Sequence, residues 1–176
     1  MKCGTFLMAG LASAAVAGIA SADVELFFDV SGPGGTGYTV DIEADGGLAG
    51  LNIAFDFTNA GGYTWAGDLF ITIVDPNGTA IQFGGYNVDA GYTDAGDFDN
   101  SFDTSTSGAF AWNQALESFG LSGSGTWTIG FYDGYTGGAA TDNWAGVINL
   151  EGLAVPAPGA LALLGLAGLA GRRRRA

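Results

Sequence analysis

Carboxylates crowd one short stretch of this 176-residue chain, which contains no histidine and a single cysteine. Acidic side chains there are interleaved with Gly96, Phe98 and Phe102, and hard oxygen ligands in such a pattern suit Ca²⁺. The stretch lacks the turn glycine and closing glutamate of an EF-hand loop, so a solvated acidic loop is the alternative. The predicted ligands of a low-affinity Ca²⁺ site are Asp94, Asp97, Asp99 and Asp103, with Asp89 as a further contributor.

Aromatic residues in or beside glycine-rich segments offer a second kind of site. Exposed rings in a concave surface stack on sugar faces, whereas buried rings only build a core. Trp65 and Trp112 are the preferred sugar-binding candidates, because each is expected in a turn and not in the middle of a strand. The other rings in such segments are Tyr63, Tyr86, Tyr92, Tyr132 and Tyr135.

Catalytic chemistry is restricted by composition. Between residues 4 and 171 the chain has no histidine, lysine, arginine or cysteine, so the usual general base, cationic clamp and strong nucleophile are missing. A pair of carboxylates alone hydrolyses glycosides, but 18 acidic residues make any single pairing uninformative. The sequence therefore predicts a protein that is not an enzyme, with a carboxylate-based glycosidase as a remote alternative.

The elements expected to position these residues are β-strands. Seven short runs rich in β-branched and aromatic residues are each bounded by Gly, Asp, Asn or Pro. Residues 110–119 are the only stretch outside the termini that suggests a helical turn. Short strands joined by glycine-rich turns predict an all-β fold, an antiparallel β-sandwich or jelly roll. The expected strands are 26–30, 38–42, 51–57, 69–74, 80–83, 126–132 and 144–150.

The N-terminus has the pattern of a secretory signal peptide over residues 1–22. Lys2 precedes an apolar run from Phe6 to Ile19, and small residues follow, which predicts cleavage between Ala22 and Asp23. Residues 23–154 then form one exported domain. At the other end, residues 159–171 are rich in Leu, Ala and Gly, which predicts a short transmembrane helix with cytoplasmic arginines after it.

The charge divides along the same boundaries. All 18 acidic residues lie from Asp23 to Glu151, whereas the five basic residues are Lys2 and the four terminal arginines. The exported domain therefore carries a formal charge of −18, although the whole chain carries −13 at pH 7. Nucleic acid is excluded as a partner because binding phosphates requires lysine and arginine.

The C-terminal 22 residues resemble the PEP-CTERM sorting signal of exported bacterial proteins. The resemblance implies processing by an exosortase-like membrane enzyme and delivery to an exopolysaccharide-rich envelope. One departure is that alanine replaces the acidic residue of the usual Pro-Glu-Pro, so a variant sortase, membrane retention or an ordinary tail anchor remain alternatives. The motif residues are Val155, Pro156, Ala157 and Pro158, followed by Arg172, Arg173, Arg174 and Arg175.

Residues 48–151 resemble the P domain, also called P/Homo B, that accompanies subtilisin-like proprotein convertases. The resemblance rests on the Gly-Asp-Leu strand from Gly67 with its Pro-x-Gly-Thr turn, the Gly-x-Trp strand from Gly125, and the strand after Trp144. It implies a jelly-roll module. We do not expect the family's role of supporting a protease to carry over, because these 176 residues contain no segment expected to form a protease domain.

These observations predict an exported protein of the cell envelope, cell surface or extracellular matrix, with transient or permanent inner-membrane anchoring. Its expected role is structural or adhesive and involves exopolysaccharide or another surface glycan. A carbohydrate-binding module, in a Ca²⁺-dependent form or without metal, is the first alternative.

Overall fold

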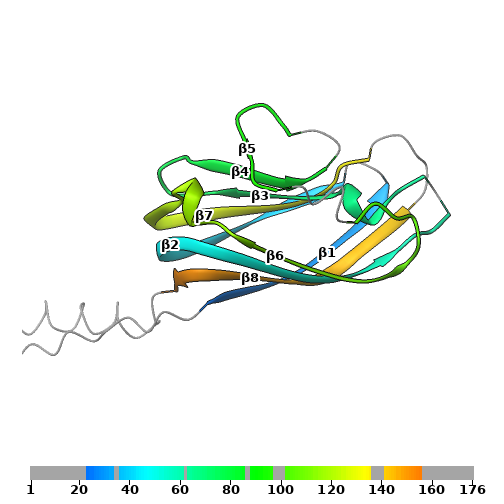
Figure 1. Ribbon diagram of the computed structural model, residues 1–176, viewed down its shortest axis with the longest axis horizontal. Helices are drawn as coiled ribbons and strands as arrows, with labels where there is room; N and C mark the ends of the chain where they lie inside the picture. Colours follow the sequence, from blue (N-terminus) through cyan, green and yellow to red (C-terminus); the bar gives the residue numbers. More distant parts are fainter. Residues whose placement is uncertain are drawn as a thin grey trace, which may run out of the picture.

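The computed structural model describes residues 23–33, 36–61, 63–85, 88–96, 102–135 and 141–155. The fold is all-β, and its strands form one hydrogen-bonded sheet in the order β1-β8-β2-β7-β3-β4-β5, with β6 pairing on β2 (Figure 1). The pairings are antiparallel except for β4 with β5. The strands are β1 Val24–Pro33, β2 Gly37–Thr58, β3 Leu69–Val74, β4 Ala80–Gly84, β5 Thr93–Asp94, β6 Gly108–Ala115, β7 Ser122–Asp133 and β8 Thr141–Ala154, with 3-10 turns at Ala66–Asp68 and Glu117–Phe119.

Strand β2 divides the sheet into two groups. Its residues 37–47 pair with β7, whereas residues 50–58 lie between β6 and β8. The register shifts between Gly46 and Gly50, and Gly46 has a φ of 126°, a conformation open to glycine. We call β1, β8, residues 50–58 of β2 and β6 the four-strand group, and the remaining strands with residues 37–47 of β2 the β7 group. Figure 1 shows these groups one above the other.

The hydrophobic core lies between the two groups. Phe28 of β1 stacks on Phe131 of β7 with 4.8 Å between ring centroids. Phe83 of β4 meets Trp112 of β6 edge to face at 5.6 Å. Aromatic contacts of this kind therefore join the two groups, in addition to the burial of their aliphatic faces.

All seven expected strands lie within strands of the structure, whereas the expected helical turn was wrong. Residues 38–42 and 51–57 both belong to β2. The expected helical turn at 110–119 is instead strand β6 followed by a 3-10 turn at Glu117–Phe119. The physical reason is a period of two: Phe110, Trp112 and Gln114 are partly buried, and the residues between them are exposed.

The two ends of the described chain lie at the same end of the molecule. Val24 pairs with Leu150, and β8 ends four residues later at Ala154. Asp23 and Val155 therefore both lie at this end of the sheet. Both residues are exposed. The predicted signal peptide up to Ala22 and the sorting tail from Pro156 to the terminal arginines lie outside the described residues. Within the described part, no helix is long and apolar enough to cross a membrane.

The turn between β3 and β4 is organised by one buried carboxylate. Asp75 Oδ1 accepts hydrogen bonds from the backbone N–H groups of Asn77 and Thr79, and Oδ2 accepts one from Ser122 at 3.0 Å. Burial acts to raise the pKa of Asp75, but the N–H donors of Ser122, Thr79 and Asn77 outweigh burial and hold the pKa below its usual value. This side chain thus ties the turn to the start of β7.

We expect Asp75→Asn to destabilise the protein by about 1–2 kcal/mol, because one oxygen acceptor becomes a donor facing a donor. Since the folded pKa is lowered, the stabilisation by Asp75 is present above its usual pKa and is lost as the pH falls through the folded value. Urea unfolding of both proteins between about pH 7 and pH 2 measures this. Asp56→Asn, at an exposed carboxylate, controls for loss of one charge. Equal stability of wild type and Asp75→Asn at neutral pH would contradict the prediction.

Candidate functional site

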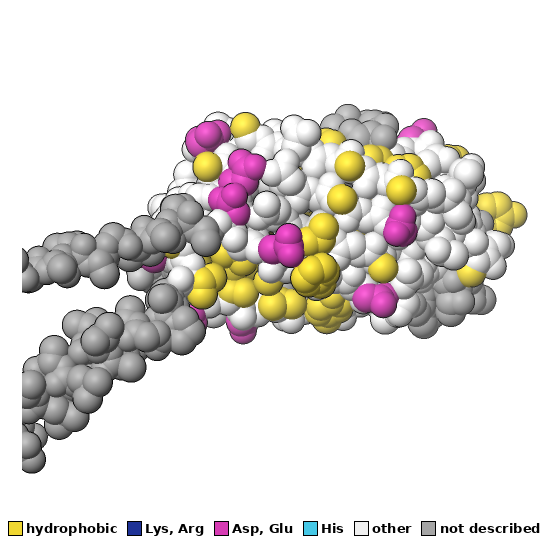
Figure 2. Space-filling view, turned by 90° about the horizontal axis from the view of Figure 1, so that it is seen from below, with side chains coloured by type: hydrophobic (Ala, Val, Ile, Leu, Met, Phe, Trp, Pro, Cys, Tyr) yellow, Lys and Arg dark blue, Asp and Glu magenta, His cyan; other side chains and the backbone are white. Residues whose placement is uncertain are grey.

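The outer face of the four-strand group carries the candidate site. Side chains on this face alternate with buried ones along each strand: in β2, Asn52, Ala54 and Asp56 face outward, whereas Ile53 and Phe55 are buried. The view in Figure 2 looks onto this side of the molecule, where hydrophobic and acidic side chains are interspersed. We call this surface the groove face.

Cross-strand register arranges the groove face in rows. Residues directly opposite one another on adjacent strands point to the same side, and successive rows are about 6.8 Å apart along a strand. The acidic row contains Asp29, Ala145, Asp56 and Ala109; the apolar row contains Phe27, Val147, Ala54 and Ala111; and the amide row contains Glu25, Asn149, Asn52 and Asn113.

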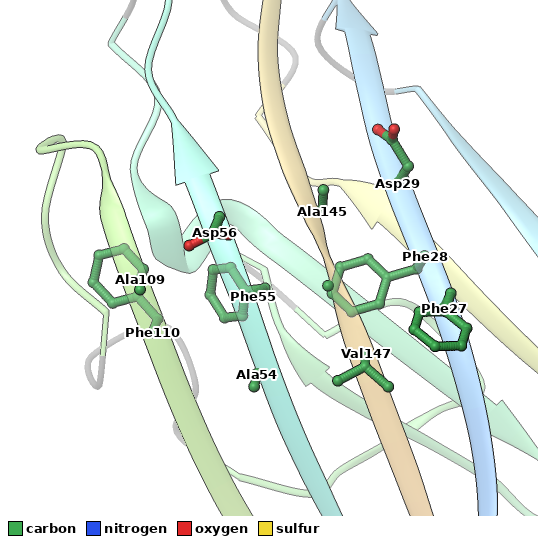
Figure 3. Close-up of a pocket in the computed structure, with 11 residues that line it drawn as sticks. Phe27, Phe28, Asp29, Ala54, Phe55, Asp56, Ala109, Phe110, Ala145 and Val147 are labelled. Atoms are coloured by element: carbon green, nitrogen blue, oxygen red, sulfur yellow. The ribbon is translucent and has the colours of Figure 1, made fainter.

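The groove face is hollowed along its strands. A depression of about 540 Å³ lies at the acidic and apolar rows, where Figure 3 shows the residues that line it. A second of about 360 Å³ shares Ala54 and Val147 with the first, and a third of about 250 Å³ shares Asn52 and Asn113 with the second. The three depressions therefore adjoin one another and together cross the rows in turn, and we call them the groove.

Small side chains create this groove. The outward positions of its floor hold alanine at 54, 109, 111 and 145, and Gly146 lies between Phe28 and Phe55 in the sheet. A Cβ on Gly146 would lie 2.2 Å from the carbonyl oxygen of Ala54, so no larger residue fits there. At the β1 side stands Phe27, an exposed large hydrophobic residue with 77% of its surface accessible. The result is a low apolar floor beside one projecting aromatic ring.

The polar groups of the groove face are partly engaged with one another. Asn52 Nδ2 donates to Glu151 Oε1 at 2.5 Å, and Asn143 Nδ2 donates to Asp29 Oδ1 at 2.7 Å. Asn149 Oδ1 is buried and has no hydrogen-bond partner among the described residues.

The predicted calcium ligands are only partly described. Asp94 and Asp103 are exposed, and Asp94 Oδ1 accepts a hydrogen bond from the Gly96 backbone. Asp97 and Asp99 lie outside the described residues. Within the described ranges no three acidic side chains come together as potential metal ligands. The Ca²⁺ site stays a prediction.

The two predicted sugar-binding tryptophans lie in different settings. Trp65 precedes the 3-10 turn at Ala66–Asp68 and is 41% exposed, as expected for a ring in a turn. Trp112 is not in a turn: it lies within β6, and its ring packs against the core beside Phe83. Its expected turn position was wrong because β6 was not expected. Sugar binding at either ring stays a prediction.

The sequence reasoning missed the groove-face residues. These residues come from four strands, in segments that were expected to form buried strands or a helical turn. They are Phe27, Asn52, Asn113 and Asn149. A usable signal was alanine at outward positions 54, 109, 111 and 145 of three neighbouring strands, because small outward residues side by side leave a groove.

Comparison with known proteins leaves the chain without an assigned family. No family model and no curated protein matches it. The serine protease of Aeromonas sobria aligns over 76% of this chain and 27% of the protease chain, with 16% sequence identity and a TM-score of 0.38. The same protease in complex with a chaperone aligns over 77% of this chain and 28% of that chain, with 15% sequence identity and a TM-score of 0.36. The VP2 subviral particle of infectious bursal disease virus aligns with 88% and 50% at 17% identity and 0.22. This chain thus spans half or less of each of these chains, and likenesses this low in TM-score carry no functional argument.

Proposed function

We propose that this protein is an exported, non-catalytic β-sandwich of jelly-roll type that acts at the cell surface or in the extracellular matrix by adhering to exopolysaccharide. The observation that carries the proposal is the groove face, where an apolar row lies between an acidic row and an amide row. The two strand groups with the core between them support the sandwich.

A sugar chain complements such rows. Each sugar ring has apolar faces of C–H groups and a rim of hydroxyls, so a ring over Phe27 and Ala54 buries C–H surface. Hydroxyls on its two sides then reach Asp29 and Asp56 in one direction and the exposed Asn113 of the amide row in the other. Because the groove continues across the rows, it accepts an extended polymer better than a compact ligand.

The positions of the chain ends fit attachment at one end. Asp23 and Val155 both leave the sheet where β1 begins and β8 ends. Once the signal peptide before Asp23 has been removed, a PEP-CTERM-like tail after Val155, processed by an exosortase-like enzyme or retained in the membrane, would hold that end of the domain. The strands of the groove face then run away from the attachment point, and the groove stays accessible.

Phe27→Ala is expected to weaken polysaccharide binding by about tenfold, because the variant loses the exposed aromatic ring beside the apolar floor. The measurement is co-sedimentation of the purified full-length chain in detergent with an insoluble neutral glucan or glucosamine polymer. Phe27 is exposed, so we expect the variant to unfold at a similar urea concentration to the wild type.

Tyr63→Ala is the matched control, because Tyr63 is 80% exposed but does not line the groove. The proposal predicts that it binds like wild type. If Tyr63→Ala and Phe27→Ala lose binding equally, the groove face is not the site. If the wild type binds no polymer of a broad panel, the adhesive function itself fails.

Two other functions stay open as proposals. The first is a dedicated carbohydrate-binding module. If Trp65 supplies an added ring, Trp65→Ala would reduce binding; if Ca²⁺ binds at the acidic stretch from Asp94 to Asp103, chelators would abolish binding.

The second is a carboxylate glycosidase. It is favoured by one observation: Glu117 and Glu151 both line the depression of about 250 Å³. Release of soluble sugars during the binding assay would identify that activity.

A further inference from the structure

The groove face carries negative charge without a positive counterpart. Glu25, Asp29, Asp56 and Glu151 all point to this face or line its groove. No lysine or arginine occurs between residues 3 and 171, so no side chain of the described domain neutralises them. Any ligand that enters the groove meets this charge directly.

The groove face also has more hydrogen-bond acceptors than donors. Carboxylates only accept, and the amides of Asn52 and Asn143 already donate to Glu151 and Asp29. Each of these two carboxylates retains a second oxygen, and the buried Oδ1 of Asn149 has no partner among the described residues. The exposed carboxylates therefore favour a ligand that donates hydrogen bonds, above all one with charged N–H groups, over a ligand that only accepts them.

Resting on the proposed function, we propose that the polysaccharide bound here bears free amino groups, as a partly deacetylated hexosamine polymer does. Its ammonium groups lie against Asp29 and Asp56 of the acidic row, its ring faces cover the apolar row, and its hydroxyls meet the amide row. Charge complementarity selects this occupant over a uronic acid polymer, whose carboxylates would face the carboxylates of the groove.

The first experiment compares two polymers that differ in amino groups alone. The full-length chain in detergent is mixed with deacetylated poly-glucosamine or with its fully N-acetylated counterpart, and bound protein is measured at several salt concentrations. We expect the deacetylated polymer to bind about tenfold more tightly near 50 mM NaCl. We expect that preference to shrink toward one near 1 M NaCl, because salt screens exposed charges.

The second experiment locates the effect on the groove face. The double variant Asp29→Asn with Asp56→Asn is expected to reduce binding to the deacetylated polymer by about fivefold and to leave binding to the acetylated polymer nearly unchanged. The matched control is Asp41→Asn with Glu43→Gln, which removes the same charge from exposed positions of the β7 group. It is expected to bind both polymers almost as the wild type does.

The outcomes separate this inference from the proposed function. If the acetylated polymer binds as tightly as the deacetylated one, the amino-group inference is overturned and the adhesive function stands. If both double variants lose binding equally, the preference comes from the overall charge of the domain, and the acidic row is not its cause. If neither polymer nor any other glycan binds, the proposed function fails as well.

Discussion

The melting temperature of this protein is expected to rise by about 5 °C or more between about 10 mM and about 1 M NaCl. The domain has 18 acidic residues, and no lysine or arginine lies between residues 3 and 171, so its folded state holds repelling charges without ion pairs. In β2, Asp41, Glu43 and Asp45 stand at alternate positions, where side chains share one face about 6.8 Å apart. Charges this close lie within a Debye length at low salt and are screened at high salt.

Thermal unfolding followed by circular dichroism measures this effect, with sodium chloride as the salt because sulfate also strengthens apolar burial. Asp41→Asn with Glu43→Gln supplies the control, since fewer repelling charges should give a smaller rise. The side-chain hydroxyls of Thr128 and Thr126 donate to Asp41 and Glu43, and these bonds persist with an amide oxygen as acceptor. A melting temperature that stays constant over the whole salt range would show that self-repulsion does not limit the stability.

Local sequence pattern was sufficient for the strands that form the centre of the β7 group. Leu69, Ile71 and Ile73 alternate with residues of the opposite face and are fully buried, as their spacing predicted. Trp127, Ile129 and Phe131 behave in the same way in β7. These strands were predictable because their burial follows from a period of two that is visible within six or seven residues.

Strand β6 and the course of β2 were not predictable in the same way. In the segment around Phe110 and Trp112, aromatic residues alternate with alanines. Alanine has the highest intrinsic helix propensity, so the segment by itself suggests a helix. Its strand conformation depends on pairing with β2, which is more than fifty residues earlier. Likewise, the glycines from Gly46 to Gly50 looked like the end of a strand, but β2 continues through them with a register shift.

The candidate site depends even more strongly on long-range pairing. The amide row joins Glu25 to Asn149, Asn149 to Asn52, and Asn52 to Asn113, so the row exists only when four strands adopt this register. The spacing of residues within any one of these strands does not predict the amide row. Phe27 is an exception, because it shares its face with Glu25 and Asp29 and alternates with the buried Phe28 and Val30, so the period of two within β1 already places its ring outward.

Trp144→Phe is expected to destabilise the protein by about 3 kcal/mol, more than the equivalent change at Trp127. Both rings are fully buried in the core. Trp144 Nε1 donates a hydrogen bond of 3.0 Å to the carbonyl oxygen of Ala66, a buried residue, whereas Trp127 Nε1 is buried without a partner among the described residues. The two substitutions remove the same atoms, but one creates an unpaired buried polar group and the other removes one.

In Trp144→Phe the Ala66 carbonyl loses its donor and remains out of contact with water, which adds the cost of an unsatisfied buried group to that of the cavity. In Trp127→Phe the cavity cost is offset because an unpaired N–H disappears from the core. The two variants should therefore differ by about 1–3 kcal/mol in free energy of unfolding, measured by urea denaturation with equal m-values. Equal losses of stability would mean that the Trp144 hydrogen bond contributes no net stability, or that Trp127 Nε1 has a partner such as a buried water. Hydrogen exchange of the two indole N–H groups separates these explanations, because only a hydrogen-bonded N–H is protected.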